Sequence, residues 1–295
     1  MTWRAVARKD FRDSLRSRWL WVLTALFVLV FSLPPLLVFY LEMGAGGGRG
    51  GGTTDAFLYL MKQGTATLVP LISIVIGYAA VTRERESGTL KLLLSLPHSR
   101  DDVVFGKVLG RSAVVGVSIL GGFVFAAVVL LFTSLEFAAV NYLLFALLTL
   151  LLGLVFVGLS VGISAAASTS RRSMVACVAL YISFIVLWST LTNQIVAALN
   201  DQFDMEVAGL AKVSLFIKLL NPTTAYKTLV DTVLAEKQLN ARLELFNQFV
   251  RPTVAQAFGG SVPFYFSDVF VMAYLLFWLF VPVAIGIFVF ERADL

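Results

Sequence analysis

The chain has 295 residues, of which 59% are hydrophobic and 14% are charged, and its formal net charge is +5. With a mean hydropathy of +0.88, it has too little polar surface to cover a water-soluble globule, which indicates an integral membrane protein. Most cations lie beside apolar runs, so anionic lipid headgroups are a better counterpart for them than nucleic acid. The single cysteine, Cys177, excludes an intrachain disulfide and a cysteine-based metal site.

Residues 1–18 are predicted to form a basic amphipathic helix on the membrane surface. Four apolar residues recur at intervals of four, namely Trp3, Ala7, Phe11 and Leu15. Four arginines follow the same interval one position later, namely Arg4, Arg8, Arg12 and Arg16. This spacing places an apolar and a cationic stripe side by side on one helix. We expect residues 1–18 to be an interfacial domain and residues 19–295 to be the membrane-spanning domain.

Six apolar runs are long enough to cross a bilayer, which takes about 20 residues. They are residues 19–41, 57–82, 103–133, 137–167, 173–199 and 267–290. A secretory signal is the alternative for the first run, but its basic and apolar parts are both too long for one, so we expect an anchor. The glycine-rich stretch 44–54 follows no predicted strand, so we expect a flexible outer loop rather than a phosphate-binding loop.

The distribution of Lys and Arg predicts the orientation of these spans. Of the 23 cations, six precede the first span, six lie between residues 83 and 111, two are Arg171 and Arg172, and one is Arg292. If six spans alternate, all of these lie on one side, and the positive-inside rule makes that side cytoplasmic. We therefore expect a multi-pass protein of the cell membrane with both termini in the cytoplasm.

The loop at about 83–102 is the only densely charged segment between two long apolar runs, and we call it the charged loop. Its leucines are too few to span a bilayer, but Leu90, Leu93 and Leu94 share one helical face that fits an apolar pocket. Glu84 and Glu86 offer charge-assisted bonds to cations of a partner, and Gly88 permits a bend. The residues alone leave two readings open: a docking surface, or a solvated loop whose Glu and Arg side chains pair with one another.

The long loop at about 200–266 is expected on the outer side, because long loops cross membranes regardless of charge. Its apolar stretch 207–220 has about 14 residues and contains Lys212 and Lys218, so we expect it not to span. If it did span, the last helix would be inverted. Asn221 and Pro222 end this stretch, and one helix is predicted for residues 225–250. Together these segments predict an outer cap of short amphipathic helices.

The sequence lacks the motifs of enzymes that hydrolyse ATP or use a metal. Gly106-Lys107 is followed by Val108 and has no glycine five residues earlier, so it is no P-loop. We therefore predict no catalytic, cofactor-binding or metal site. Ionisable residues are almost absent from the middle of the spans, which disfavours ion-coupled transport and favours drive by a partner. Small residues four apart, as in Gly106–Gly110 and Gly158–Gly162, are typical of close helix packing, which we expect within the chain rather than at a dimer seam.

Three sequence motifs resemble those of the permeases of ATP-binding-cassette transporters of the second exporter class. They are RERESGTL at 83–90, the Pro-x-x-Arg of Pro97 to Arg100, and Gly106-Lys107 at the start of the third span. The basic first helix, the outer helices and the closing FERADL extend the resemblance over nearly the whole chain. It is strongest to the branch that contains the permease of nitrous oxide reductase copper-site maturation, and it leaves the cargo open.

The resemblance implies an all-α integral membrane fold with six transmembrane helices, an N-terminal interfacial helix, a cytoplasmic coupling helix and an outer helical cap before the last span. It implies that the chain is an exporter subunit and that a separate ATPase subunit binds ATP and receives the coupling helix in a cleft. Two such ATPases would act with two permeases, the second being a copy or a homologue of this chain. The implied coupling residues are Arg83, Glu84, Arg85, Glu86, Gly88, Thr89, Leu90, Pro97 and Arg100. A membrane anchor or scaffold for an outer enzyme, or an ion-independent secondary carrier, is the alternative.

Overall fold

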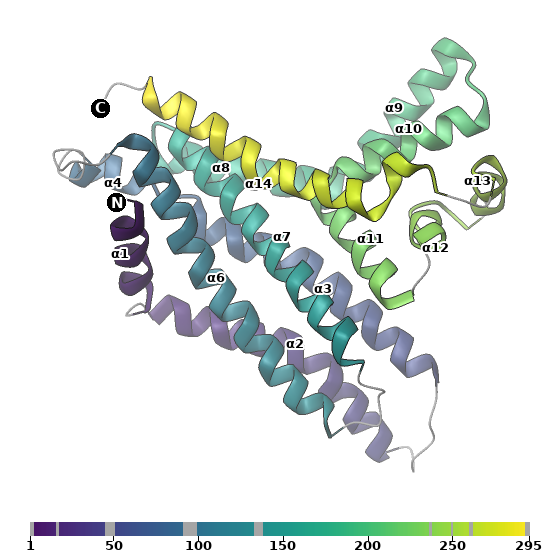
Figure 1. Ribbon diagram of the computed structural model, residues 1–295, viewed down its shortest axis with the longest axis horizontal. Helices are drawn as coiled ribbons and strands as arrows, with labels where there is room; N and C mark the ends of the chain where they lie inside the picture. The colour runs from purple at the N-terminus through teal and green to yellow at the C-terminus, as the bar shows by residue number, and fades with distance from the viewer. Residues whose placement is uncertain are drawn as a thin grey trace. The chain divides into compact units, whose positions relative to one another are not determined.

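A computed structural model describes residues 3–15, 18–44, 51–90, 99–132, 138–235, 238–248, 250–259 and 262–292. Every regular element among these residues is a helix (Figure 1). The chain divides into two compact units, one made of Met1–Val178 and Leu279–Leu295 and the other of Ala179–Trp278.

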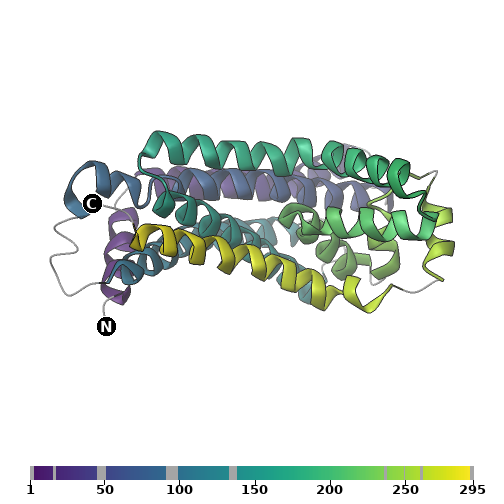
Figure 2. The ribbon, with the colours of Figure 1, turned by 90° about the horizontal axis from the view of Figure 1, so that it is seen from above.

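The first unit is a helical bundle built around α6. Its helices are α1 (Trp3–Leu15), α2 (Arg18–Gly44), α3 (Gly51–Gly77), α4 (Thr82–Glu86), α6 (Arg100–Leu130) and α7 (Ala139–Ala166). The start of α8 (Ser170–Ile182) and the end of α14 (Asp268–Glu291) also belong to it. Helix α6 packs against α1, α2 and α7, and α7 packs against α3. Helix α1 lies at the end of the unit where both chain termini are found (Figures 1 and 2).

Glycines allow these helices to approach one another closely. A Cβ atom added to Gly106 would lie 2.6 Å from Cβ of Val6, so α6 approaches α1 at a distance that only glycine allows. On α7, a Cβ at Gly162 would collide with the carbonyl oxygen of Pro282 in α14. Both small-residue patterns found in the sequence therefore serve contacts within the chain.

The second unit holds the rest of α8 and α14 and the short helices between them. These are η1 (Ser183–Leu187), which is a π-helix, α9 (Trp188–Phe203), α10 (Val207–Leu220), α11 (Pro222–Ala235), α12 (Gln238–Leu243), α13 (Arg251–Ala257) and the 3-10 helix η2 (Phe264–Phe266). Buried Asn221 joins two of them. Its Nδ2 donates to the Phe184 carbonyl in η1 at 2.6 Å, and its Oδ1 accepts from the backbone N–H of Thr223 at 2.9 Å, at the start of α11.

Five helices among the described residues are long and apolar enough to cross a membrane. They are Met61–Glu86, Arg100–Leu130, Ala139–Ala166, Ser170–Phe203 and Asp268–Glu291. A shorter apolar stretch, Trp21–Leu37, lies within α2. The expectation of an all-helical membrane bundle is confirmed, and the stretch 207–220 is the 14-residue helix α10.

Two sequence-based expectations need correction. The single helix predicted for 225–250 is wrong, because α11 ends at Ala235 and α12 ends at Leu243. After α12 the chain turns, with backbone hydrogen bonds from Leu245 N to Arg242 O and from Phe246 N to Leu243 O. The Arg242 side chain is buried in the protein interior. The outer loop predicted for 44–54 is shorter than expected because α3 begins at Gly51, and residues 45–50 lie outside the described residues.

Candidate functional site

The described part of the charged loop consists of a short helix and a turn. After α3 ends at Gly77, residues 78–81 form a turn and α4 carries Arg83 to Glu86. Ser87 and Gly88 reverse the chain, with Gly88 at φ 75°, and a new helical segment starts at Thr89. Glycine is favoured at a positive φ because it has no Cβ, so this backbone conformation explains the bend expected at Gly88. Residues 91–98, including Pro97, Leu93 and Leu94, lie outside the described residues.

A serine of α7 holds the junction between α3 and α4. The backbone N–H groups of Val81 and Thr82 lie where the helical hydrogen-bond pattern is interrupted, and both donate to Oγ of Ser164, at 3.1 Å and 3.2 Å. This hydroxyl takes the place of a helix cap, because the interrupted helix leaves these donors without carbonyl partners. The direction in which α4 leaves α3 is therefore fixed by α7.

The two acidic residues of α4 bind neighbouring helices of the same chain. Glu84 Oε1 lies 2.8 Å from Lys107 Nζ in α6, and the Lys107 side chain is only 3% exposed. Glu86 accepts from the backbone N–H and the hydroxyl of Ser170, both at 2.7 Å, at the first residue of α8. A carboxylate at a helix N-terminus is favourable, because the first N–H groups have no partner within the helix. The side chains expected to face a partner protein thus bind within this chain.

Two arginines bind the carbonyl ends of helices. Arg85 donates from Nη1 to the Ala167 carbonyl at 2.8 Å, at the end of α7, and Arg100 donates to the Phe290 and Glu291 carbonyls of α14 at 2.6 Å and 2.8 Å. Cations stabilise helix C-termini, where carbonyl groups lack partners. Both guanidinium groups also lie over the ring of Phe290, at 5.3 Å and 5.5 Å from its centroid.

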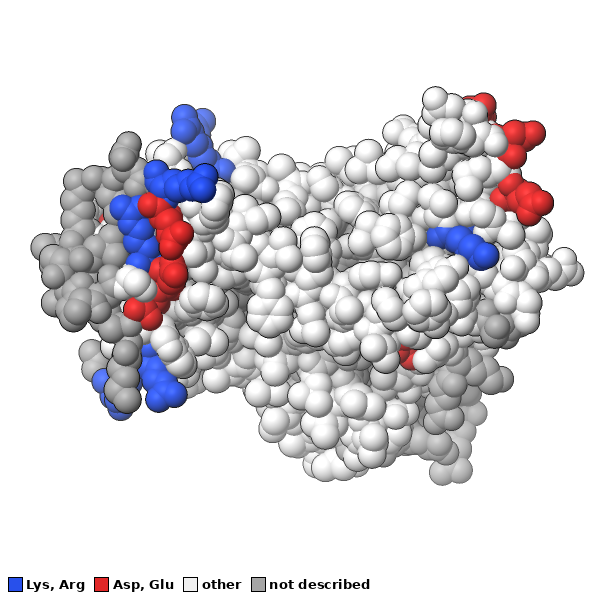
Figure 3. All heavy atoms as spheres, turned by 45° about the horizontal axis from the view of Figure 1, so that its top comes forward, with Lys and Arg blue, Asp and Glu red and all other residues white. Residues whose placement is uncertain are grey.

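Helix α4 is thus joined to α6 by Glu84, to α7 and α14 by Arg85, and to α8 by Glu86. Arg100 joins the start of α6 to the end of α14. We call these four side chains with their partners the coupling network. Arg83 and Thr89 are exposed, whereas Leu90 is buried. On the face drawn in Figure 3, charged side chains gather at the end of the first unit that carries α4, beside a broad uncharged surface. Charges at span ends and uncharged side chains along them suit a lipid boundary.

Sequence reasoning missed the partners of these residues. Neither Ser164, in the apolar run of α7, nor Ser170, in the polar stretch 168–173, was predicted as a partner of the charged loop. Lys107 did carry a sequence signal, because a lysine that follows the start of an apolar span needs an anion within reach. The Glu84 carboxylate, 23 residues earlier and at the end of the preceding span, was the candidate.

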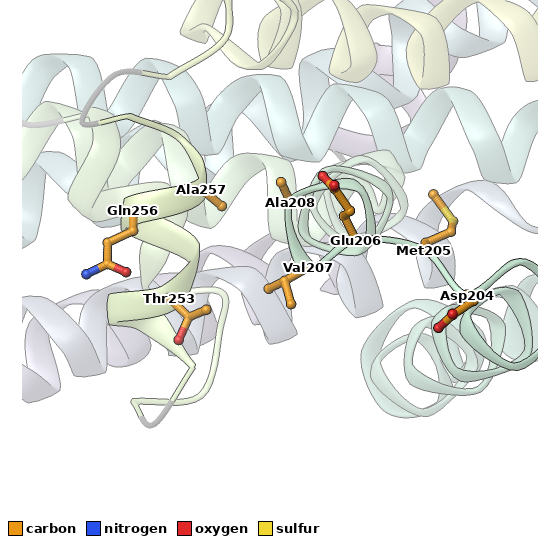
Figure 4. A pocket seen from close by; sticks show the side chains of 8 residues that line it. All are labelled: Asp204, Met205, Glu206, Val207, Ala208, Thr253, Gln256 and Ala257. Atoms are coloured by element: carbon orange, nitrogen blue, oxygen red, sulfur yellow. The ribbon is translucent and has the colours of Figure 1, made fainter.

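A second candidate region is an open cavity of about 600 Å³ in the second unit. Figure 4 shows its lining side chains: Asp204, Met205 and Glu206 from the α9–α10 connection, Val207 and Ala208 from α10, and Thr253, Gln256 and Ala257 from α13. Among the described residues, no group of three or more His, Cys, Asp or Glu side chains is placed to hold a metal ion. This cavity is an open groove with an acidic wall and no catalytic constellation.

Residues 4–295 match the model of the ABC-2 family transporter proteins. The chain belongs to this family. Two probable ABC transporter permease proteins, both named NosY, are similar to it over 226 residues, which cover 75% of this chain and 78% of each relative. The one from Pseudomonas aeruginosa is 29% identical and the one from Stutzerimonas stutzeri is 26% identical.

The chain is therefore a multi-pass membrane protein and the NosY-like permease subunit of an ABC transporter. Permease subunits of this kind lack ATPase activity and pair with ATPase subunits that hydrolyse ATP. For the permease, the coupling network is the described region where one charged segment contacts several membrane helices.

Proposed function

We propose that α4 and the residues that follow it transmit the motion of a cytoplasmic ATPase subunit to the membrane helices of this permease. The observation that carries the proposal is the convergence of α6, α7, α8 and α14 on α4. A short helix bonded to several spans passes on a displacement better than a loop attached only by its chain ends. The segment 83–102 with Pro97 and Arg100 is thus the coupling segment.

The proposal divides the coupling residues into two groups. Glu84, Arg85, Glu86 and Arg100 hold the coupling segment to the spans through the coupling network. Gly88 and Thr89 are exposed and remain available to the ATPase, and Arg83 is exposed and lines a cavity in the first unit. The acidic side chains pair within the chain, with Lys107 and Ser170 rather than with the arginines of the segment, while the segment as a whole acts as a docking surface.

We further propose six spans with both termini in the cytoplasm of a cell-membrane protein. Helix α2 supplies the first span, because its 27 residues reach about 40 Å at 1.5 Å per residue. Of the 23 Lys and Arg residues, 15 then lie on the side of the coupling segment, as the positive-inside rule requires. Helices α10 to α13 form the outer cap. Two permeases and two ATPases assemble into an exporter, and closure of the ATPases pushes the coupling segments inward.

The test is ATPase stimulation by the permease reconstituted in vesicles with its ATPase. Glu84→Lys combined with Glu86→Lys reverses both anchoring charges, so we expect ATP hydrolysis to lose its dependence on the permease while membrane insertion is unchanged. The matched control is Asp201→Lys with Glu206→Lys, which makes the same charge change at exposed positions of the second unit. Normal coupling in the first double variant would overturn the proposal.

A second experiment locates the docking surface. A cysteine at exposed Thr89, in a Cys177→Ser background, should crosslink to the ATPase subunit, and a membrane-impermeant thiol reagent added from outside should not reach it. A cysteine at Asp201 should show the opposite pattern. Labelling of the Thr89 position from outside would place the coupling segment on the wrong side of the membrane.

A further inference from the structure

A cavity of about 510 Å³ opens in the first unit between α1, α2, the α3–α4 junction and α6. One wall is apolar and is formed by Leu23, Val75, Ile76, Ala79 and Val114. Its rim is charged and carries Asp10, Asp13, Arg83, Glu84 and Arg111. An apolar wall with a charged rim at the end of membrane helices matches the boundary between acyl chains and headgroups.

Three of the five rim charges already have an ion-pair partner within the chain. Asp10 Oδ2 lies 2.9 Å from Arg111 Nε, and Glu84 pairs with Lys107 at 2.8 Å. Asp13 and Arg83 remain, and neither forms an ion pair with another residue that the structure describes. The cavity therefore offers one exposed anion on α1 and one exposed cation on α4 above an apolar wall.

We propose that this cavity binds the headgroup of a zwitterionic phospholipid that carries a primary ammonium group. The phosphate binds Arg83, because a guanidinium presents a fork of donors that suits phosphate oxygens. The ammonium binds the carboxylate of Asp13. The acyl chains run along α3, where Leu71 and Val75, four residues apart, expose apolar surface next to the cavity.

The charges distinguish this lipid from other ligands. Phosphatidylglycerol would satisfy Arg83 with its phosphate, but its uncharged glycerol headgroup has no cation to neutralise the Asp13 carboxylate. A choline headgroup has no N–H to donate to the Asp13 carboxylate, so it loses the hydrogen bonds of the primary ammonium. A soluble phosphate compound would leave the apolar wall uncovered. A bound aminophospholipid would join α1 to α4 and so support the coupling segment from the membrane side.

The experiment is native mass spectrometry of the full-length permease in detergent, without ATPase, after incubation with phosphatidylethanolamine, phosphatidylcholine or phosphatidylglycerol of the same acyl chains. We expect phosphatidylethanolamine to be retained best. Asp13→Asn should reduce its retention to the phosphatidylcholine level, a change of about two- to fivefold, which is the size of an exposed ion pair. Arg83→Gln should reduce retention of all three lipids. Asp13→Glu keeps the carboxylate and should keep the preference.

The matched control is Arg12→Gln, which removes an exposed cation from α1 next to Asp13 but outside the cavity lining. It should leave the lipid preference unchanged. Equal retention of the three lipids, stronger retention of phosphatidylglycerol, or equal retention by Asp13→Asn and Arg12→Gln would each overturn the proposal. Because the measurement contains no ATPase, its outcome is independent of whether the coupling segment drives transport.

Discussion

The coupling network of the first unit and the short helices of the second unit both bury a cation, but they give it different numbers of partners. Lys107 pairs with Glu84, whose side chain is 26% exposed. Arg242 is 0% exposed and binds four acceptors, namely Asp268 Oδ1 at 2.6 Å, Phe266 O at 3.0 Å, Thr228 O at 3.4 Å and Thr232 Oγ1 at 3.4 Å. A cation with many buried acceptors fixes its surroundings, because its departure leaves several polar groups unpaired.

The difference fits the two roles. Burial lowers the pKa of Arg242 and the Asp268 carboxylate opposes that change, and the guanidinium stays protonated. In the coupling network each helix end is held by a separate contact, and one of the paired groups in each contact reaches the surface. Loss of one such contact leaves the others in place, which fits the proposed movement of the coupling segment.

The largest effect is expected for the buried arginine. Arg242→Met leaves the Asp268 carboxylate without its cation and should lower the free energy of unfolding by about 3 kcal/mol. The double variant with Asp268→Asn should be less destabilised than the single one, because the charge is removed together with its partner. Chemical denaturation in detergent measures both, with exposed Lys212→Met as the control. A change within about 0.5 kcal/mol of that control would remove the distinction between the two regions.

Asn221 tests whether the second unit depends on convergent hydrogen bonds in general. Asn221→Ala removes the donor to the Phe184 carbonyl and the acceptor for Thr223, so we expect a loss of about 2 kcal/mol. Asn221→Asp keeps the acceptor and loses the donor, and its loss should lie between those of Asn221→Ala and the wild type. Exposed Asn200→Ala is the control in the same denaturation assay. Equal losses for the alanine and aspartate variants would mean that the cap of α11 contributes nothing.

Exchanging the charges of Glu84 and Lys107 distinguishes two hypotheses, an ion pair within this chain and a docking contact between Glu84 and the ATPase. Lys107→Met should cost about 1.5 kcal/mol, less than Arg242→Met, because Glu84 keeps access to water. Glu84→Lys should reduce ATPase stimulation, and Glu84→Lys with Lys107→Glu should restore part of it. If Glu84 instead bound a cation of the ATPase, the exchanged pair would stay as defective as Glu84→Lys alone.

The smallest effect is expected at the turn of the coupling segment. Gly88→Ala forces a residue with a Cβ into φ 75°, which costs about 1 kcal/mol although a Cβ there would meet nothing within 4 Å. Gly88→Asn should cost less, because Asn adopts this conformation more readily. Gly64→Ala, in the middle of α3, is the control and should not destabilise the protein. Thermal stability and ATPase stimulation are read on the same samples, and equal values for Gly88→Ala and Gly88→Asn would exclude backbone strain.

The positions of the membrane helices followed from the sequence because a bilayer forces the backbone to satisfy its hydrogen bonds within each segment. The run 103–133 became α6 at Arg100–Leu130, and α10 ends where Asn221 and Pro222 stop the apolar stretch. The bend at Gly88 was also indicated by the glycine itself, and its positive φ came from the structure. In each case the information lies within a few residues of the feature that it determines.

The tertiary structure alone decided which polar groups meet. Glu86 finds Ser170 across 84 residues, and Asn221 finds Phe184 across 37. The helix predicted for 225–250 is instead two helices, α11 and α12, and Arg242 of α12 binds acceptors on other elements that the local sequence does not reveal. Length and hydrophobicity are properties of one segment, so the sequence states them directly. The partner of a buried polar group depends on which helices are neighbours, and that is settled only when the whole chain packs.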